Sequence, residues 1–241
     1  MELSCNYHFY HNIFNYEFNI SFGYPRSDVC DLCERHQVAI AAAKVSRNRT
    51  ELQRAEFAHE LHLRKAEVFN VQLNEVTEAS KAMGESCNTA VICIDYQKNL
   101  PLPVTGVSQE YYKRQLWIHN LCVHDNVNNN ATMFLYSEHF AAKGPNEVIS
   151  CLDYYISHLP QSIKKLHIFA DNCFSQNKNR YLIAHLQIVA NTKLKEVHVH
   201  YPLPGHSCMP CDRDFGRIEK NRRKKDMVVK PSEWVNLISR D

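Results

Sequence analysis

In the stretch Leu166-His167-Ile168-Phe169-Ala170-Asp171-Asn172, an apolar run ends in a carboxylate and then breaks into polar residues. Apolar runs of this length are typical of buried strands. The same arrangement occurs earlier, where Val91-Ile92-Cys93-Ile94 leads into Asp95. A carboxylate at the end of a buried strand is costly unless it is paired or bound to a metal. We therefore predict two strands that bring Asp95 and Asp171 to one place.

Taken alone, an aspartate after a strand usually caps a helix or begins a turn. The pair is more informative if the two strands are neighbours. We expect residues 90–95 and 165–170 to pair in parallel, because the second strand returns beside the first through a right-handed crossover. Two carboxylates at one edge of a sheet would form part of a two-metal phosphoryl-transfer site.

The composition sets the broad class of protein. The chain has 241 residues, 44% of them hydrophobic, which is enough for one large or two small domains. The net charge of +2 neither favours nor excludes nucleic acid. No apolar run is long enough to span a membrane, and the N-terminus shows no secretory signal. The ten cysteines lack the density of a small secreted scaffold. We expect an intracellular protein, in the nucleus, that does not contact membranes.

The order of the expected elements indicates two domains. Residues 1–86 hold an aromatic arm over residues 1–25 and a helical hairpin, whose second helix begins at a capping box of Thr50 and Gln53. From residue 87 the periodicity changes to that of strands. We expect strands at 90–95, 112–119, 132–137, 165–170 and 196–201, and helices at 145–158, 179–192 and 212–224.

Three strands in hairpins followed by helix, strand, helix, strand and helix is the element order of the ribonuclease H fold. The predicted fold class is therefore α/β, a ribonuclease H-like mixed five-stranded sheet with flanking helices over residues 87–241. That fold carries acids at the first strand, the helix after the third strand, the fourth strand and a late helix. At those places the chain has Asp95, Glu147, Asp171 and the pair Asp212 and Asp214.

A second metal site is predicted in the N-terminal domain. Cys30 and Cys33 form a Cys-x-x-Cys knuckle. If the two helices fold back around residues 46–49, these cysteines lie level with two histidines on one face of the second helix. Two thiolates and one or two imidazoles suit tetrahedral zinc. The predicted zinc ligands are Cys30, Cys33, His59 and His62, with His36 competing for the place of His59. The alternative is free cysteines beside half-buried histidines.

The chain also resembles an uncharacterised family of transposon-derived eukaryotic proteins. The resemblance covers residues 14–238 and rests on the segments FNISFGYPRSDVCDLCE, HLRKA, CIDYQKNLPLP, RQLWIHNL, KGPNEV, FADNCFSQNKNR and YPLPGHSCMPCDRDFGRIEK. It implies a ribonuclease H-like domain of the transposase or integrase type.

These observations lead to one favoured function and one rival. The favoured one is a transposase-derived nuclease or strand-transferase that acts on nucleic acid, DNA in the first place, by two-metal phosphoryl transfer. Magnesium or manganese would be held by Asp95, Asp171 and Asp212 or Asp214, with Glu147 completing the shell and His206 orienting water or phosphate. Gln176, Asn177, Lys178 and Asn179 form a polar patch for a phosphate backbone; the alternative is a helix N-terminus. The rival is a catalytically inactive DNA-binding or interaction protein of the same descent.

Overall fold

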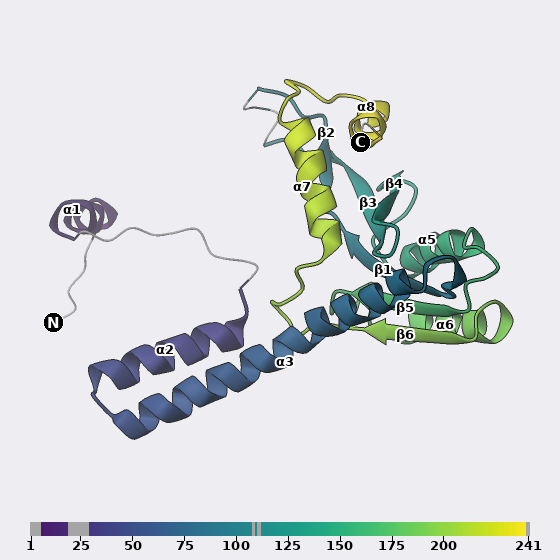
Figure 1. The fold of residues 1–241 in the computed structure, drawn as a ribbon. Coiled ribbons are helices and arrows are strands. Elements are labelled where there is room, and N and C mark those ends of the chain that lie inside the picture. Colours follow the sequence, from purple (N-terminus) through teal and green to yellow (C-terminus); the bar gives the residue numbers. More distant parts are fainter. Residues whose placement is uncertain (1–5, 19–28, 108, 110–111, 240–241) are drawn as a thin grey trace.

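The computed structural model describes residues 6–18, 29–107, 109 and 112–239. In this part of the chain the protein is α/β, with one mixed six-stranded sheet and flanking helices (Figure 1). The strands are β1 Thr89–Tyr96, β2 Leu100–Leu102, β3 Leu116–Asp125, β4 Asn130–Ser137, β5 Lys165–Ala170 and β6 Glu196–His200. No helix in the described residues is both long enough and apolar enough to cross a membrane.

The expected pairing of the two aspartate-bearing strands is confirmed. The strands run in the order β4-β3-β1-β5-β6, and the short β2 also pairs with β3. β1 and β5 are parallel neighbours, in a register that sets Ile94 opposite Ala170. Parallel strands end at the same edge of a sheet. Asp95 and Asp171, which come directly after the paired residues Ile94 and Ala170, therefore lie beside each other at that edge.

Helices cover both faces of the sheet. On one face, α5 Pro145–Ser157 and α6 Arg180–Thr192 pack on Ile92, Ile94 and Ile168. On the other face, α3 Arg49–Ala82, α7 Pro210–Arg222 and α8 Pro231–Ile238 pack on residues of the opposite parity, such as Cys93 and Phe169. Side chains alternate along a strand, so Asp95 and Asp171 share this second face. The 3-10 turn η1 Gly84–Ser86 joins α3 to β1.

The helices before the sheet begin differently from the prediction. α2 Asp31–Val45 packs alongside the N-terminal half of α3 (Figure 1). The N-cap of α3 is Asn48, whose side chain accepts a hydrogen bond from the Glu51 N–H at 3.2 Å, and not Thr50. In the aromatic arm, Tyr7–Glu17 forms helix α1, which buries none of its residues. Residues 1–5 and 19–25 of the arm lie outside the described part.

Two expectations for the sheet and one for the last expected helix need correction. The sheet has six strands and not five, because Leu100–Leu102 pairs with β3 despite its central Pro101. The strand expected at 112–119 is Leu116–Asp125. The helix expected at 212–224 begins two residues earlier, at Pro210, and ends at Arg222.

Candidate metal centre and carboxylate cavity

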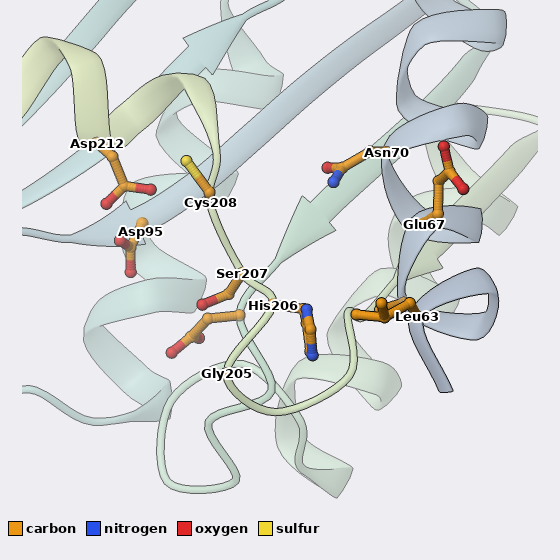
Figure 2. Close-up of a pocket in the computed structure, with 11 residues that line it drawn as sticks. Leu63, Glu67, Asn70, Asp95, Gly205, His206, Ser207, Cys208 and Asp212 are labelled. Carbon is orange, nitrogen blue, oxygen red and sulfur yellow. The ribbon is translucent and has the colours of Figure 1, made fainter. Parts of the chain in front are cut away.

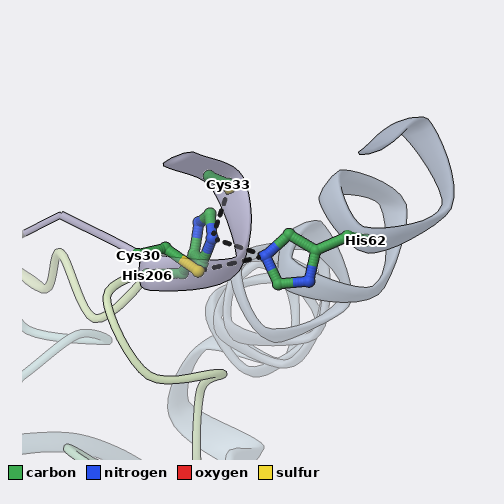
Figure 3. Close-up of side chains that lie close together, drawn as sticks. All are labelled: Cys30, Cys33, His62 and His206. Atoms are coloured by element: carbon green, nitrogen blue, oxygen red, sulfur yellow. Dashed lines mark hydrogen bonds between the residues drawn. The ribbon is translucent and has the colours of Figure 1, made fainter. Parts of the chain in front are cut away.

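Four side chains from three separate parts of the chain converge on one point (Figure 3). Cys30 is the N-cap residue of α2, Cys33 lies in its first turn, His62 is on α3, and His206 lies between β6 and α7. Nε2 of His62 is 3.2 Å from Sγ of Cys30 and 3.1 Å from Nε2 of His206, which is 3.4 Å from Sγ of Cys33. Their candidate ligand atoms all lie within 4.8 Å of one another.

This Cys–His cluster has the chemistry of a transition-metal site. Two thiolates and two imidazoles are a tetrahedral zinc set, so the cluster could bind a metal such as zinc. Burial and the neighbouring His206 lower the pKa of His62, which keeps its imidazole neutral and able to coordinate. Burial, with a hydrogen bond involving Cys30, raises the pKa of the Cys33 thiol, and a bound metal would reverse this effect by favouring the thiolate.

The fourth residue of the cluster differs from the prediction. His59 and His36 lie beside it, with ring centroids 5.8 Å apart, but neither belongs to the group of converging ligand atoms. His206 takes that place, and it also lines the cavity that Asp95 and Asp171 share, beside which it was expected. The signal was missed because His206 is 144 positions from His62, so no helical register links the two.

Gly205 explains how His206 reaches the cluster. Its φ of +78° lies in the left-handed region that glycine adopts without strain. A Cβ atom at this position would lie 2.6 Å from Cα of Cys30. The turn therefore packs its bare backbone against the knuckle, and a side chain would force the two segments apart.

The two aspartates that end β1 and β5 line a cavity of about 920 Å³ beside this cluster. Figure 2 shows the cavity between α3, the segment that carries His206, and the start of α7. Its other acid from the predicted set is Asp212, in the first turn of α7. Leu63, Ala66, Glu67, Asn70, Gly205, His206, Ser207 and Cys208 complete the lining. Within the described residues, these carboxylates do not form a group as tight as the Cys–His cluster.

Electrostatics single out Asp95 within the cavity. Burial, and then the charges of Asp171 and Asp212, raise its pKa to about 7. The Tyr96 N–H, which donates to Oδ1 of Asp95 at 2.8 Å, and the ammonium of Lys143 act in the opposite direction. The charges of Asp171 and Asp212 are close enough to Asp95 to disfavour its ionised form, which is the environment that a cation would relieve.

Asp171 is held by the polar segment that follows it. The side-chain amide of Asn177 donates to Oδ1 of Asp171, and the Tyr201 hydroxyl donates to the Asn177 carbonyl at 2.6 Å. Asn177 is buried, and Asn179 is the N-cap of α6, so these two residues support the structure. In the predicted patch, Gln176 is half-buried and Lys178 is exposed, with its ammonium over the rings of Phe174 and Tyr201.

The structure distinguishes Asp212 from Asp214, between which the sequence could not decide. Oδ2 of Asp212 accepts a hydrogen bond from the Met209 N–H at 2.8 Å at the edge of the cavity. Asp214 is buried under the sheet instead, with Oδ2 2.6 Å from Nδ1 of His124, and does not line the cavity. Two residues along a helix differ by roughly 200° of rotation, so both acids cannot face the same side.

Glu147 lies away from the other acids. Its Oε2 accepts a hydrogen bond from the Gly144 N–H at 2.9 Å, at the N-terminus of α5. It lines a different cavity, with Tyr136 and Cys151. Its place is explained by helix capping, which satisfies an otherwise unpaired N–H.

Two polar residues that α3 contributes to the cavity were not predicted from the sequence. Glu67 and Asn70 reach its lining from α3, which was interpreted only as a hairpin helix. Both are exposed, on the side of the helix that the apolar stripe leaves free. In the sequence, the signal for these two residues was their closeness to His62. That closeness could be linked to the carboxylate cavity only once the position of α3 against the sheet was known.

Comparison with known proteins gives one family. Residues 108–238 match a family described as a domain of unknown function, DUF7869. No curated protein and no solved structure matches the chain. The matched region includes Asp171, His206 and Asp212, whereas Asp95 and the other three residues of the Cys–His cluster precede it. Because the match covers more than half of the 241 residues, the chain belongs to the DUF7869 family.

Proposed function

We propose that this protein is a transposase-derived nuclease or strand-transferase that acts on nucleic acid, DNA in the first place, by two-metal phosphoryl transfer. The observation that carries the proposal is the convergence of Asp95, Asp171 and Asp212 on one cavity from three distant elements. Carboxylates are the ligands that magnesium and manganese prefer, and a shared cavity is what a two-metal site requires.

The sheet topology supports the same proposal. The order β4-β3-β1-β5-β6, with β1 antiparallel to β3 and parallel to β5, is compatible with the ribonuclease H-like sheet expected from the sequence. The acids stand at the end of the first strand, the end of the strand parallel to it, and the late helix, which are three of the four places expected for that fold. The fourth place, Glu147, is used for capping.

The residues around the acids have definable tasks. Bound magnesium or manganese would activate a water or a 3′-hydroxyl and stabilise the leaving oxygen. Asn177 fixes one oxygen of Asp171, and the Tyr96 N–H fixes one oxygen of Asp95. Asp95 must lose its proton, which a pKa of about 7 allows near neutral pH. Lys178, whose exposed ammonium lies over the Tyr201 ring, would contact a backbone phosphate.

The test is metal-dependent cleavage of a labelled DNA duplex. We expect Asp171→Asn to lower the rate by about a hundredfold or more, as when a group that stabilises developing charge is removed. The matched control is Asp226→Asn, which removes an exposed carboxylate outside the cavity and should cleave as wild type does. Mn²⁺ should also raise the melting temperature of wild type more than that of Asp171→Asn.

Two outcomes would contradict the proposal. Cleavage that is equal in wild type and Asp171→Asn would come from a contaminant. Tight DNA binding with no cleavage, and equal stabilisation of both proteins by Mn²⁺, would favour the rival function of an inactive DNA-binding protein. The position of Glu147 outside the cavity is the observation that favours this rival.

A further inference from the structure

One short segment links the two candidate metal sites. It begins at His206 in the Cys–His cluster, passes Ser207 and Cys208 on the cavity wall, and ends at Asp212 in the first turn of α7. Figure 2 shows Cys208 next to Asp212, with His206 at the far end of the same segment. A displacement at the His206 end of so short a segment therefore changes the direction from which the chain enters α7.

The α7 end of the segment is anchored in the core. Met209 is buried, and its N–H donates to Oδ2 of Asp212. Cys211 is also buried, with its Sγ 3.4 Å from the carbonyl oxygen of Cys93 on β1. These contacts fix where α7 starts, but the direction from which the chain enters the helix depends on the residues before Met209.

The other end is held at the knuckle. The His206 ring meets His62 at 3.1 Å and Cys33 at 3.4 Å, and the bare backbone of Gly205 packs against Cys30. Contacts between neutral thiols and imidazoles are weak hydrogen bonds. Bonds from thiolates and imidazoles to a zinc ion are far stronger. A bound metal would thus hold the His206 ring in one position at the cluster.

We propose that a metal bound by Cys30, Cys33, His62 and His206 positions Asp212 in the carboxylate cavity, with His206 acting as a positioning residue. This inference rests on the proposed function, because it assigns the Cys–His cluster a role in assembling the Mg²⁺ or Mn²⁺ site. The cluster then serves the cavity through the chain that joins them, and contributes no ligand to it.

The experiment measures Mn²⁺ affinity in the full chain loaded with zinc, by the electron paramagnetic resonance signal of free Mn²⁺. Zinc content is measured in parallel, and cobalt substitution reports whether the cluster is tetrahedral. The variants are His206→Ala, Asp212→Asn, the double variant and His206→Cys. The matched control is His158→Ala, which removes an exposed histidine on α5's C-cap.

We expect His206→Ala to lose zinc and to weaken Mn²⁺ binding about tenfold, within the usual range of coupling between sites. Asp212→Asn should weaken Mn²⁺ binding to a similar extent while retaining zinc. The double variant should be no weaker than Asp212→Asn alone, because His206 acts through Asp212. His206→Cys should keep zinc and bind Mn²⁺ as wild type does, since three thiolates and one imidazole also form a zinc set.

The outcomes separate this inference from the proposed function. If Asp171→Asn binds Mn²⁺ as tightly as wild type, the carboxylate site does not exist and both proposals fall. If Mn²⁺ binding depends on Asp171 but is unchanged in zinc-free His206→Ala, the proposed function stands and the positioning role is overturned. Additive losses in the double variant would also overturn it.

Discussion

Asp95 is a carboxylate whose surroundings work against its charge. Burial, Asp171 and Asp212 all disfavour ionisation of Asp95, whereas the Tyr96 N–H and the Lys143 ammonium favour it. Its pKa of about 7 lies well above the ordinary value of 3.8. An unfolded chain would release the proton that the folded protein retains between these values, so Asp95 makes stability depend on pH.

The sign of this dependence follows from the raised pKa. The contribution of Asp95 to stability is complete below pH 3.8 and is lost as the pH rises through about 7. In zinc-loaded, magnesium-free protein, wild type should therefore lose stability relative to Asp95→Asn between pH 5 and pH 8, by an amount of order 2 kcal/mol. Denaturant unfolding at the two pH values measures it, with Asp226→Asn as the control. A difference between wild type and Asp95→Asn that stays constant would contradict the raised pKa.

Among single residues, the sequence predicted the two aspartates at the strand ends, but it did not decide between Asp212 and Asp214. Asp95 and Asp171 could be found because the end of an apolar run is a local signal. The choice between Asp212 and Asp214 depends on how α7 is rotated against the sheet. That rotation is set by Cys211, Phe215 and other buried residues on the helix, and by the partners that they meet.

Among the elements, those with a regular pattern were predicted best. β5 was expected at Lys165–Ala170 with the bounds that the structure shows, because its apolar run is continuous. β2 was missed because three residues around Pro101 carry no periodicity, and a proline argues against a strand. The contact between the β6–α7 connection and α2 could not be inferred from local residues.

Gly205 gives a prediction about that connection. Gly205→Ala places a Cβ on a residue with φ +78° and against Cys30, and should cost about 2 kcal/mol or more and lower zinc affinity. Gly216→Ala is the matched control, because its Cβ would meet nothing within 4 Å in the middle of α7. Gly216→Ala should raise the free energy of unfolding by about 0.5–1 kcal/mol, because alanine has a higher helix propensity than glycine. Thermal unfolding and zinc content measure both, and equal stability of the two variants would contradict the close packing.

For the whole molecule, the Cys–His cluster is a contact between parts that are far apart in sequence. α2 buries only Cys33 and Ala43 of its own residues, so its packing rests on α3 and on the cluster. Composition and periodicity indicated two domains, one with the zinc knuckle and one with the acids. In the structure, one residue of the Cys–His cluster, His206, comes instead from the second region. Such a contact depends on the finished fold, which is why the sequence could not reveal it.

The separation of 173 positions between Cys33 and His206 has a kinetic consequence. Contacts so distant form late in folding, since the loop between them must close first. Zinc should then leave the refolding rate almost unchanged and slow unfolding, because interactions absent from the transition state act on the unfolding limb. Stopped-flow chevrons with zinc and with a chelator measure this. A refolding rate that rises in proportion to the zinc stabilisation would mean that the cluster forms early.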